Sequence, residues 1–151
     1  MKKNILLPAF IVLLAMLAAG CTQNNGHIGK LFGSWSLQEM TENGTPLKIE
    51  GEGIAVSFQS NVVRFTLIYG PDLADNSIAT WTRTGDILNF NFNNHDDKVA
   101  AGTGVYAPPF WLHLTELKES FVIARLDGGH LELVRTDAKG DVYVYKFDRT
   151  W

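Results

Sequence analysis

Residues 54–69 read IAVSFQSNVVRFTLIY and contain two short runs in which apolar and polar side chains alternate. The apolar positions are Ile54, Val56 and Phe58 in the first run, then Val63, Phe65, Leu67 and Tyr69 in the second. A period of two residues is typical of a β-strand that buries one face. Only Gln59-Ser60-Asn61 separates the two runs, which is the length of a tight turn. The stretch therefore predicts an antiparallel β-hairpin with one apolar face.

The same pattern continues on both sides of this hairpin. Further strands are predicted at residues 33–39, 77–83, 88–92, 121–126, 130–134 and 142–148. Turn signals separate them, because glycine and asparagine tolerate positive φ angles. These signals are Asn43-Gly44, Gly70-Pro71-Asp72, Thr84-Gly85-Asp86, Asp127-Gly128-Gly129 and Lys139-Gly140-Asp141. Residues 110–115 favour a strand over one helical turn, and residues 115–120 are the one short helical candidate beyond the N-terminal segment.

Eight or nine strands joined mainly by short turns predict an all-β protein with an antiparallel meander. Its apolar face must be buried, and no helix is predicted that could cover it. A sheet that closes into a barrel buries this face and removes the sheet edges at the same time. We therefore expect a barrel or half-closed barrel, with a two-sheet sandwich as the alternative.

The N-terminal segment predicts export and a lipid anchor. Lys2 and Lys3 precede an apolar run from residue 5 to 17, the order typical of a secretory signal peptide. The run is shorter than the roughly 20 apolar residues of a transmembrane helix. Leu17-Ala18-Ala19-Gly20-Cys21 resembles the lipobox of bacterial lipoproteins. The resemblance implies cleavage before Cys21 and acylation of Cys21, whereas a plain secretory signal would leave this cysteine unmodified.

These boundaries divide the chain into a signal peptide at 1–20, a flexible tether at 21–30 and one domain at 31–151. The net charge of the whole chain is −3, and loss of Lys2 and Lys3 with the signal peptide makes it −5. This balance argues against nucleic-acid binding and against a polybasic membrane-surface patch. The single cysteine excludes an intrachain disulfide. We expect a monomer.

Gly33-Ser34-Trp35 stands at the start of the first predicted strand and resembles the Gly-x-Trp signature of lipocalins. The similarity is closer still to the lipocalin-like domains of Bacteroidetes lipoproteins. This resemblance implies a lipocalin-like barrel in which Trp35 plugs the closed end and an arginine packs on its ring. Arg149 on the last strand is the expected partner, with Arg135 as the alternative.

No pattern for catalysis or for a cofactor is present. His27, His95, His113 and His130 do not have zinc-ligand spacing, so no metal is expected. Residues 93–97 contain oxygen ligands that could hold calcium, but a solvated loop tip is the favoured interpretation. We therefore expect a protein that is not an enzyme and has no cofactor.

Glu39 is the one carboxylate that the alternation of the first strand places on the inward face. A buried acid needs a partner, and Arg125 and Lys146 are the candidates. The alternative is that Glu39 lies at the open rim of the barrel in contact with solvent, which is the favoured interpretation.

Tyr69, Trp81, Phe110 and Trp111 lie near strand ends or beside the long 93–109 segment. They are the candidate ligand-binding residues, with an ordinary core role as the alternative. The expected function is that of a lipid-anchored cell-envelope protein that binds a small apolar or amphipathic ligand in a cavity gated by the 93–109 loop. The alternative is a solidly packed barrel that docks a partner protein. The expected location is the outer membrane, with its periplasmic face favoured.

Overall fold

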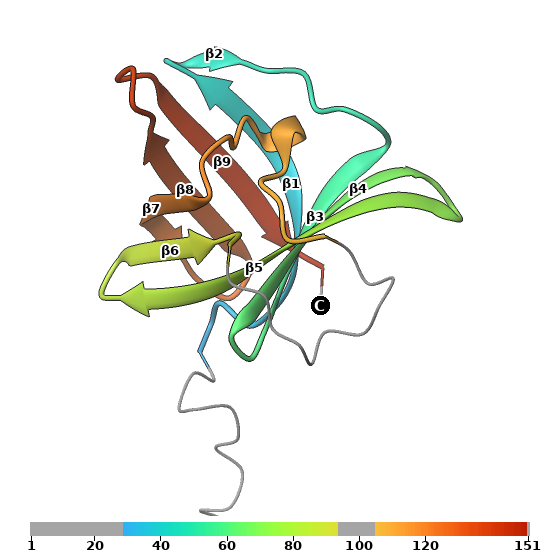
Figure 1. The fold of residues 1–151 in the computed structure, drawn as a ribbon, viewed down its shortest axis with the longest axis horizontal. Helices are drawn as coiled ribbons and strands as arrows, with labels where there is room; N and C mark the ends of the chain where they lie inside the picture. The colour runs from blue at the N-terminus through green and yellow to red at the C-terminus, as the bar shows by residue number, and fades with distance from the viewer. Residues whose placement is uncertain (1–28, 94–104, 151) are drawn as a thin grey trace, which may run out of the picture.

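The computed structural model describes residues 29–93 and 105–150 of the chain (Figure 1). Within these ranges it contains nine β-strands and one 3₁₀-helix, η1. In chain order these are β1 (Gly33–Glu42), β2 (Thr45–Pro46), β3 (Gly53–Gln59), β4 (Val62–Gly70), β5 (Leu73–Thr84), β6 (Ile87–Asn91), η1 (Phe110–Leu112), β7 (Lys118–Leu126), β8 (His130–Thr136) and β9 (Val142–Arg149). All the strand pairs are antiparallel.

The sheet closes on itself. Its order is β2-β1-β3-β4-β5-β6-β7-β8-β9, and β9 also pairs with β1. In this closing pair Trp35 lies opposite Arg149, and Met40 lies opposite Tyr145. Eight strands therefore form the barrel, and the two-residue β2 pairs with the end of β1. The predicted all-β antiparallel barrel is confirmed, and the sandwich alternative is excluded because the first and last strands of the meander are paired.

The barrel has two ends. The β3–β4, β5–β6 and β7–β8 turns lie at one end, with the start of β1 and the end of β9, and this is the closed end. The other connections lie at the opposite end, which we call the mouth. Figure 1 shows η1 and the β8–β9 turn near the mouth. The barrel therefore separates two groups of connections along its axis.

The predicted tight turns are present. Ser60-Asn61 links β3 to β4, and Ser60 has a φ angle of 48°. Asn43 and Gly44 follow β1 with φ angles of 50° and 81°, and both are positive as a type I′ turn requires. The side chain of Asn43 also donates a hydrogen bond to Asp141 at 2.9 Å, so this turn is tied to the neighbouring β8–β9 turn.

Residues 110–120 are not as predicted. Phe110–Leu112 forms η1 instead of a strand, and His113 ends it in the left-handed region with a φ angle of 56°. Strand β7 begins at Lys118, where a helix was the candidate, because Lys118 pairs with Asn91 of β6. Residues 115–120 are too few for their hydrophobic pattern to distinguish a helix from a strand. The backbone pairing with β6 makes the segment from Lys118 onward a strand.

Glu39 does not face the interior. A β-bulge lies between Leu37 and Glu39, since Leu37 pairs with Phe147 and Glu39 pairs with the adjacent Lys146. The extra residue reverses the alternation, so Met40 is buried in the place predicted for Glu39. Glu39 is exposed and forms an ion pair with Lys146 at 2.9 Å. The inward position was wrong, whereas the favoured interpretation, that Glu39 is in contact with solvent, is correct. Lys146 is the partner among the two candidates.

The β4–β5 hairpin is longer than predicted. Leu73 to Asn76 pair with the end of β4, so β5 begins four residues before position 77. The tip of this hairpin projects from the barrel in Figure 1. The predicted signal peptide, Cys21, most of the tether and most of the 93–109 loop lie outside the described residues.

Candidate ligand-binding site

Trp35 and Arg149 lie together at the closed end of the barrel. Trp35 is fully buried, and its indole N–H donates to the Leu31 carbonyl at 2.8 Å. The guanidinium carbon of Arg149 lies 4.4 Å from the centre of the Trp35 ring. Arg149 also donates hydrogen bonds to the carbonyls of Phe32 and Lys30. A guanidinium over an indole face is attractive by roughly 0.5–2 kcal/mol, so Arg149 fixes the chain segment that precedes β1.

The four candidate aromatic residues do not lie together. Tyr69 is 41% exposed on the projecting β4–β5 hairpin. Trp81 is buried, and its ring packs edge-on against Phe58 at a centroid distance of 5.5 Å. Phe110 and Trp111 are neighbours in η1, with Phe110 exposed and Trp111 buried. Only Phe110 and Trp111 therefore share a location, and Trp81 has a core position.

Aromatic rings occupy the middle of the barrel. The Phe90 ring on β6 lies 5.3 Å from the Phe65 ring, 5.1 Å from the Phe121 ring and 6.1 Å from the Phe58 ring. The Phe121 ring in turn lies 5.7 Å from the Tyr145 ring on β9. These centroid distances are those of rings in contact. Side chains from β3, β4, β6, β7 and β9 therefore meet inside the barrel.

Residues 107–117, which we call the mouth segment, cover the interior from above. Trp111, Leu112 and Leu114 of this segment are buried. The hydroxyl of Tyr145, which points inward from β9, donates to the Leu112 carbonyl at 2.8 Å. Burial raises the pKa of Tyr145 to about 12, so the hydroxyl stays a donor at neutral pH. The mouth segment is thus held onto the core by apolar packing and by this hydrogen bond.

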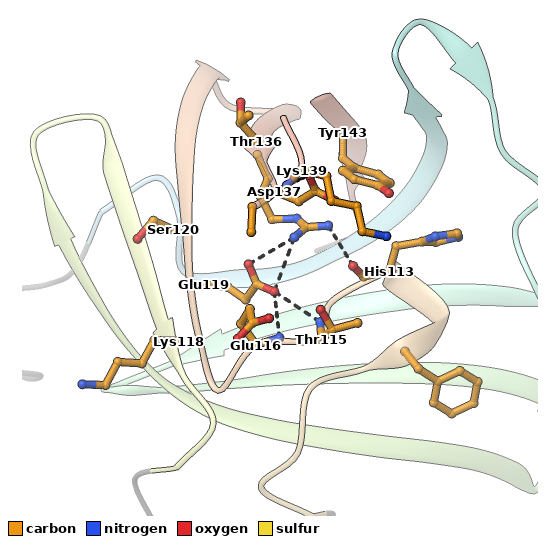
Figure 2. A pocket seen from close by; sticks show the side chains of 13 residues that line it. His113, Thr115, Glu116, Lys118, Glu119, Ser120, Thr136, Asp137, Lys139 and Tyr143 are labelled. Atoms are coloured by element: carbon orange, nitrogen blue, oxygen red, sulfur yellow. Dashed lines mark hydrogen bonds and ion pairs between the residues drawn. The ribbon is translucent and has the colours of Figure 1, made fainter. Parts of the chain in front are cut away.

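A pocket of about 520 Å³ lies between the mouth segment, the start of β7 and the β8–β9 turn (Figure 2). We call it the mouth pocket. It is lined by residues that include Phe110, His113, Glu119, Arg135, Lys139 and Tyr143. Its volume falls within the range of roughly 300–1,000 Å³ that is usual for small-molecule sites. Phe110 is thus the one candidate ligand-binding residue that lines it.

A buried ion pair forms one wall of the mouth pocket. Arg135 is 3% exposed and Glu119 is 6% exposed, and they are 3.3 Å apart. Glu119 accepts hydrogen bonds from the backbone amides of Thr115 and Glu116, and Arg135 donates to the His113 carbonyl at 2.8 Å. Figure 2 shows these bonds as dashed lines that converge on the mouth segment. The pair therefore binds the main chain of this segment.

Arg135 also stacks on the Tyr143 ring, with its guanidinium carbon 4.5 Å from the ring centre. The His113 ring lies 5.7 Å from the same Tyr143 ring. The Tyr143 hydroxyl donates to the carboxylate of Glu42, and this bond raises the pKa of Tyr143 to about 12. Burial acts to lower the pKa of Arg135, but Tyr145 and Glu119 more than offset it and raise the pKa. The pocket therefore has a charged arginine and a neutral tyrosine at pH 7.

The rim of the mouth pocket carries charges of both signs. Lys118 and Lys139 provide cations, and Glu116 and Asp137 provide carboxylates. Nε of Arg135 is buried and has no hydrogen-bond acceptor among the described residues. The pocket thus combines aromatic rings with polar groups of both kinds, which suits a molecule that has an apolar part and a polar part.

Glu119 was not among the residues singled out in the sequence, and Arg135 was considered only as a partner of Trp35. The alternation of inward and outward residues along β7 and β8 indicated an inward position for both. Arg135 continues the inward positions Leu131 and Leu133 of β8, and Glu119 precedes the inward Phe121 of β7 by two residues. Opposite charges at inward positions of neighbouring strands indicate a buried ion pair, provided that the start of β7 is known.

In the described part of the chain no three His, Cys, Asp or Glu side chains are grouped so as to hold a metal ion. His113 contacts Tyr143, and His130 bonds to Asp127. Residues 94–97 of the calcium candidate are outside the described residues. Within residues 29–93 and 105–150 there is also no helix with the length and hydrophobicity needed to cross a bilayer.

Two solved structures superpose on this chain with TM-scores of 0.50 or more. A lipocalin-like protein from Bacteroides uniformis superposes with a TM-score of 0.52 and 16% identity over 82% of this chain and 100% of the other. The fold is lipocalin-like. An uncharacterized protein from Bacteroides eggerthii superposes with a TM-score of 0.50 and 15% identity, covering 77% of this chain and 98% of that one. Lobster apocrustacyanin A1 gives a TM-score of 0.44 at 18% identity, covering 90% of this chain and 68% of that one. No protein-family model and no curated protein matches the chain.

Proposed function

We propose that this protein is a lipid-anchored lipoprotein of the bacterial cell envelope that binds a small amphipathic molecule at the mouth pocket. The single observation that carries the binding proposal is this pocket of about 520 Å³, which joins aromatic rings to the buried Arg135–Glu119 pair. The lipobox at Cys21 supports the anchor. The lipocalin-like fold supports a binding role by analogy of fold.

The mouth pocket is a better ligand site than the interior of the barrel. The rings of Phe58, Phe65 and Phe121 already contact Phe90 there. At the pocket, Phe110 and the edge of Tyr143 would cover the apolar part of a ligand. Lys139 and the carboxylates of the rim would bind its polar part. The role is binding without bond cleavage, and the outer membrane with the pocket in the periplasm is the proposed location.

The ligand is tested with residues 22–151, which contain every described strand and both ends of the barrel. This chain, made without the signal peptide, is incubated with an envelope extract of its own host and repurified, and small molecules released on denaturation are identified by mass spectrometry. We expect one reproducible compound with wild-type protein and a clear loss with Phe110→Ser. Leu73→Ser is the matched control, because Leu73 is 65% exposed and Phe110 is 67% exposed. A compound retained equally by all three proteins would place the site elsewhere.

The packed interior also favours the second candidate function, a barrel that docks a partner protein without a ligand. If no compound is released, and tryptophan fluorescence does not change during titration with lipids and hydrophobic dyes, ligand binding is excluded. Docking of a partner protein is then the remaining candidate function. The anchor is tested separately by incorporation of labelled palmitate. We expect label in the wild-type protein and none in Cys21→Ser, which should leave the membrane fraction. Label retained in Cys21→Ser would contradict the anchor.

A further inference from the structure

The closed end of the barrel is rich in arginine. Among the described residues this half of the barrel carries six cations and five carboxylates, a net charge of +1. The cations are Lys30, Arg64, Arg83, Arg125, Lys146 and Arg149, and the carboxylates are Glu39, Asp86, Asp127, Glu132 and Asp148. Arg83 and Arg125 are paired with Asp86 and Asp127. Lys30 and Arg64 are exposed and form no ion pair with the described residues.

The mouth end has the opposite charge. The end of β1 and the β1–β3 connection carry Glu42, Glu50 and Glu52 against the single Lys48, and the tip of the β4–β5 hairpin adds Asp72 and Asp75. Four more carboxylates and three cations surround the mouth pocket. These are Glu116, Glu119, Asp137 and Asp141, with Lys118, Arg135 and Lys139. The net charge of the mouth end, counted over described residues, is −5.

The chain enters the barrel at the closed end. The amide of Phe32 donates to the Gly29 carbonyl at 3.1 Å, and Arg149 binds the carbonyls of Lys30 and Phe32. Cys21 is eight residues before Gly29. Eight fully extended residues span at most about 28 Å, which is close to the length of a nine-residue strand, about 30 Å. An anchor at Cys21 therefore reaches the closed end easily and the mouth end only at full extension.

We infer that the closed end, with Lys30 and Arg64 as its unpaired cations, docks on the anionic lipid headgroups of the membrane that holds the anchor. The inference rests on the proposed anchor at Cys21. Both the point where the chain enters the barrel and the charge of the two ends favour this orientation. An anionic lipid surface attracts basic groups and repels acidic ones within a Debye length of about 8–10 Å. The mouth pocket then opens away from the membrane, so its ligand comes from the aqueous side.

The test uses the full-length lipidated protein in vesicles of phosphatidylcholine with phosphatidylglycerol. Acylation blocks the Cys21 thiol, so a fluorophore is attached to Gly128→Cys at the closed end or to Ala138→Cys at the mouth end. Gly128 has open space around it, and Ala138 is exposed. Quenching by a nitroxide on the lipid headgroup reports which end touches the membrane. We expect the label at position 128 to be quenched severalfold more than the label at position 138.

Charge reversal separates docking from simple tethering. On anionic vesicles, Lys30→Glu combined with Arg64→Glu should lower the equilibrium constant for docking by at least roughly thirtyfold, and both side chains are exposed. Lys48→Glu combined with Lys139→Glu changes the net charge equally at the mouth end and should not reduce it. Equal quenching of the two labels in floated vesicles, or equal effects of the two charge pairs, would overturn the docking. Protein that does not float with the vesicles would refute the anchor and the docking together, and it would leave the mouth pocket unaffected.

Discussion

At the scale of single residues, two arginines fix main-chain segments at opposite ends of the barrel. Arg149 stacks on Trp35 and binds two carbonyls ahead of β1. Arg135 stacks on Tyr143 and binds the carbonyl of His113 in the mouth segment. The planar guanidinium suits both places, because one face packs on a ring while the edge donates several hydrogen bonds. A lysine has the charge but not this geometry.

Arg149→Lys is therefore expected to destabilise the fold although it keeps the charge. The lost stacking and one lost hydrogen bond should lower the free energy of unfolding by about 1–2 kcal/mol, and Arg149→Ala should lower it further. Urea denaturation measures both changes. Arg83→Ala is the control, since the ion pair of Arg83 with Asp86 is long at 3.8 Å and exposed. Equal stability of Arg149→Lys and the wild type would show that the charge alone is sufficient.

Asp127 should make stability depend on pH in the acid range. Its carboxylate accepts hydrogen bonds from the amides of Gly129 and His130, and these bonds lower its pKa below the usual value of 3.8. A lowered pKa in the folded state means that the stabilisation is present above about pH 4 and is lost as the pH falls below it. Urea denaturation at pH 6 and pH 3 should show a smaller loss for Asp127→Asn than for the wild type. Asp72→Asn is the control, and an unchanged loss in Asp127→Asn would contradict this role.

Residue roles could be predicted where a short motif existed. Gly33-Ser34-Trp35 pointed to Trp35, and the position of Arg149 on the last strand made it the expected neighbour. Glu119 had no motif. Its inward position depends on where β7 begins, and that is set by the pairing of Lys118 with Asn91 far away in the sequence.

At the scale of elements, the mouth segment is held by the buried ion pair. Glu119→Ala leaves Arg135 buried without its partner, which costs about 3–5 kcal/mol, and removes the acceptor for two amides. Hydrogen exchange at Thr115 and Glu116 should therefore accelerate. Glu116→Ala, at an exposed position, should leave it unchanged. Glu119→Gln keeps an acceptor oxygen and should give an intermediate rate. Unchanged exchange in both Glu119 variants would mean that packing alone holds the segment.

The connection between β2 and β3 depends on Gly51. Its φ angle is +67°, and a Cβ at this position would overlap the carbonyl oxygen of Ile68. Gly44 has a φ angle of +81°, and a Cβ added there would meet open space, so Gly44→Ala should cost only about 1–2 kcal/mol. Gly51→Ala should lower the melting temperature by clearly more than Gly44→Ala. An equal fall in melting temperature for the two variants would show that the β2–β3 connection can move away from the added Cβ without loss of stability.

Elements were predictable where alternation was regular, and not where one residue changed it. The alternation in residues 54–69 correctly predicted both strands of the β3–β4 hairpin and the turn between them. The bulge at β1 placed Glu39 outside, because pairing with β9 accommodates an extra residue that no local pattern reveals. Residues 110–112 likewise became η1 because Trp111 and Leu112 are buried together over the barrel. Both departures come from contacts between distant parts of the chain.

At the scale of the whole molecule, barrel closure produces both the packed interior and the position of the ligand site. Eight strands leave an interior just wide enough for side chains or one small ligand. Here the rings of Phe65, Phe90 and Phe121 are in contact inside it. The mouth segment lies over these rings, so the pocket that it forms with the β8–β9 turn is a separate space.

Replacement of Phe90 tests whether the packed interior and the mouth pocket are separate spaces. Phe90→Ala should lower the free energy of unfolding by about 3–5 kcal/mol and leave an apolar cavity, whereas Phe90→Leu should be milder. A dry apolar cavity binds benzene, so benzene should raise the melting temperature of the folded Phe90 variant and leave that of the wild type unchanged. The compound bound at the mouth pocket should be retained by the variant. An equal rise in the wild type would show free space among the rings, and the ligand would then belong inside the barrel.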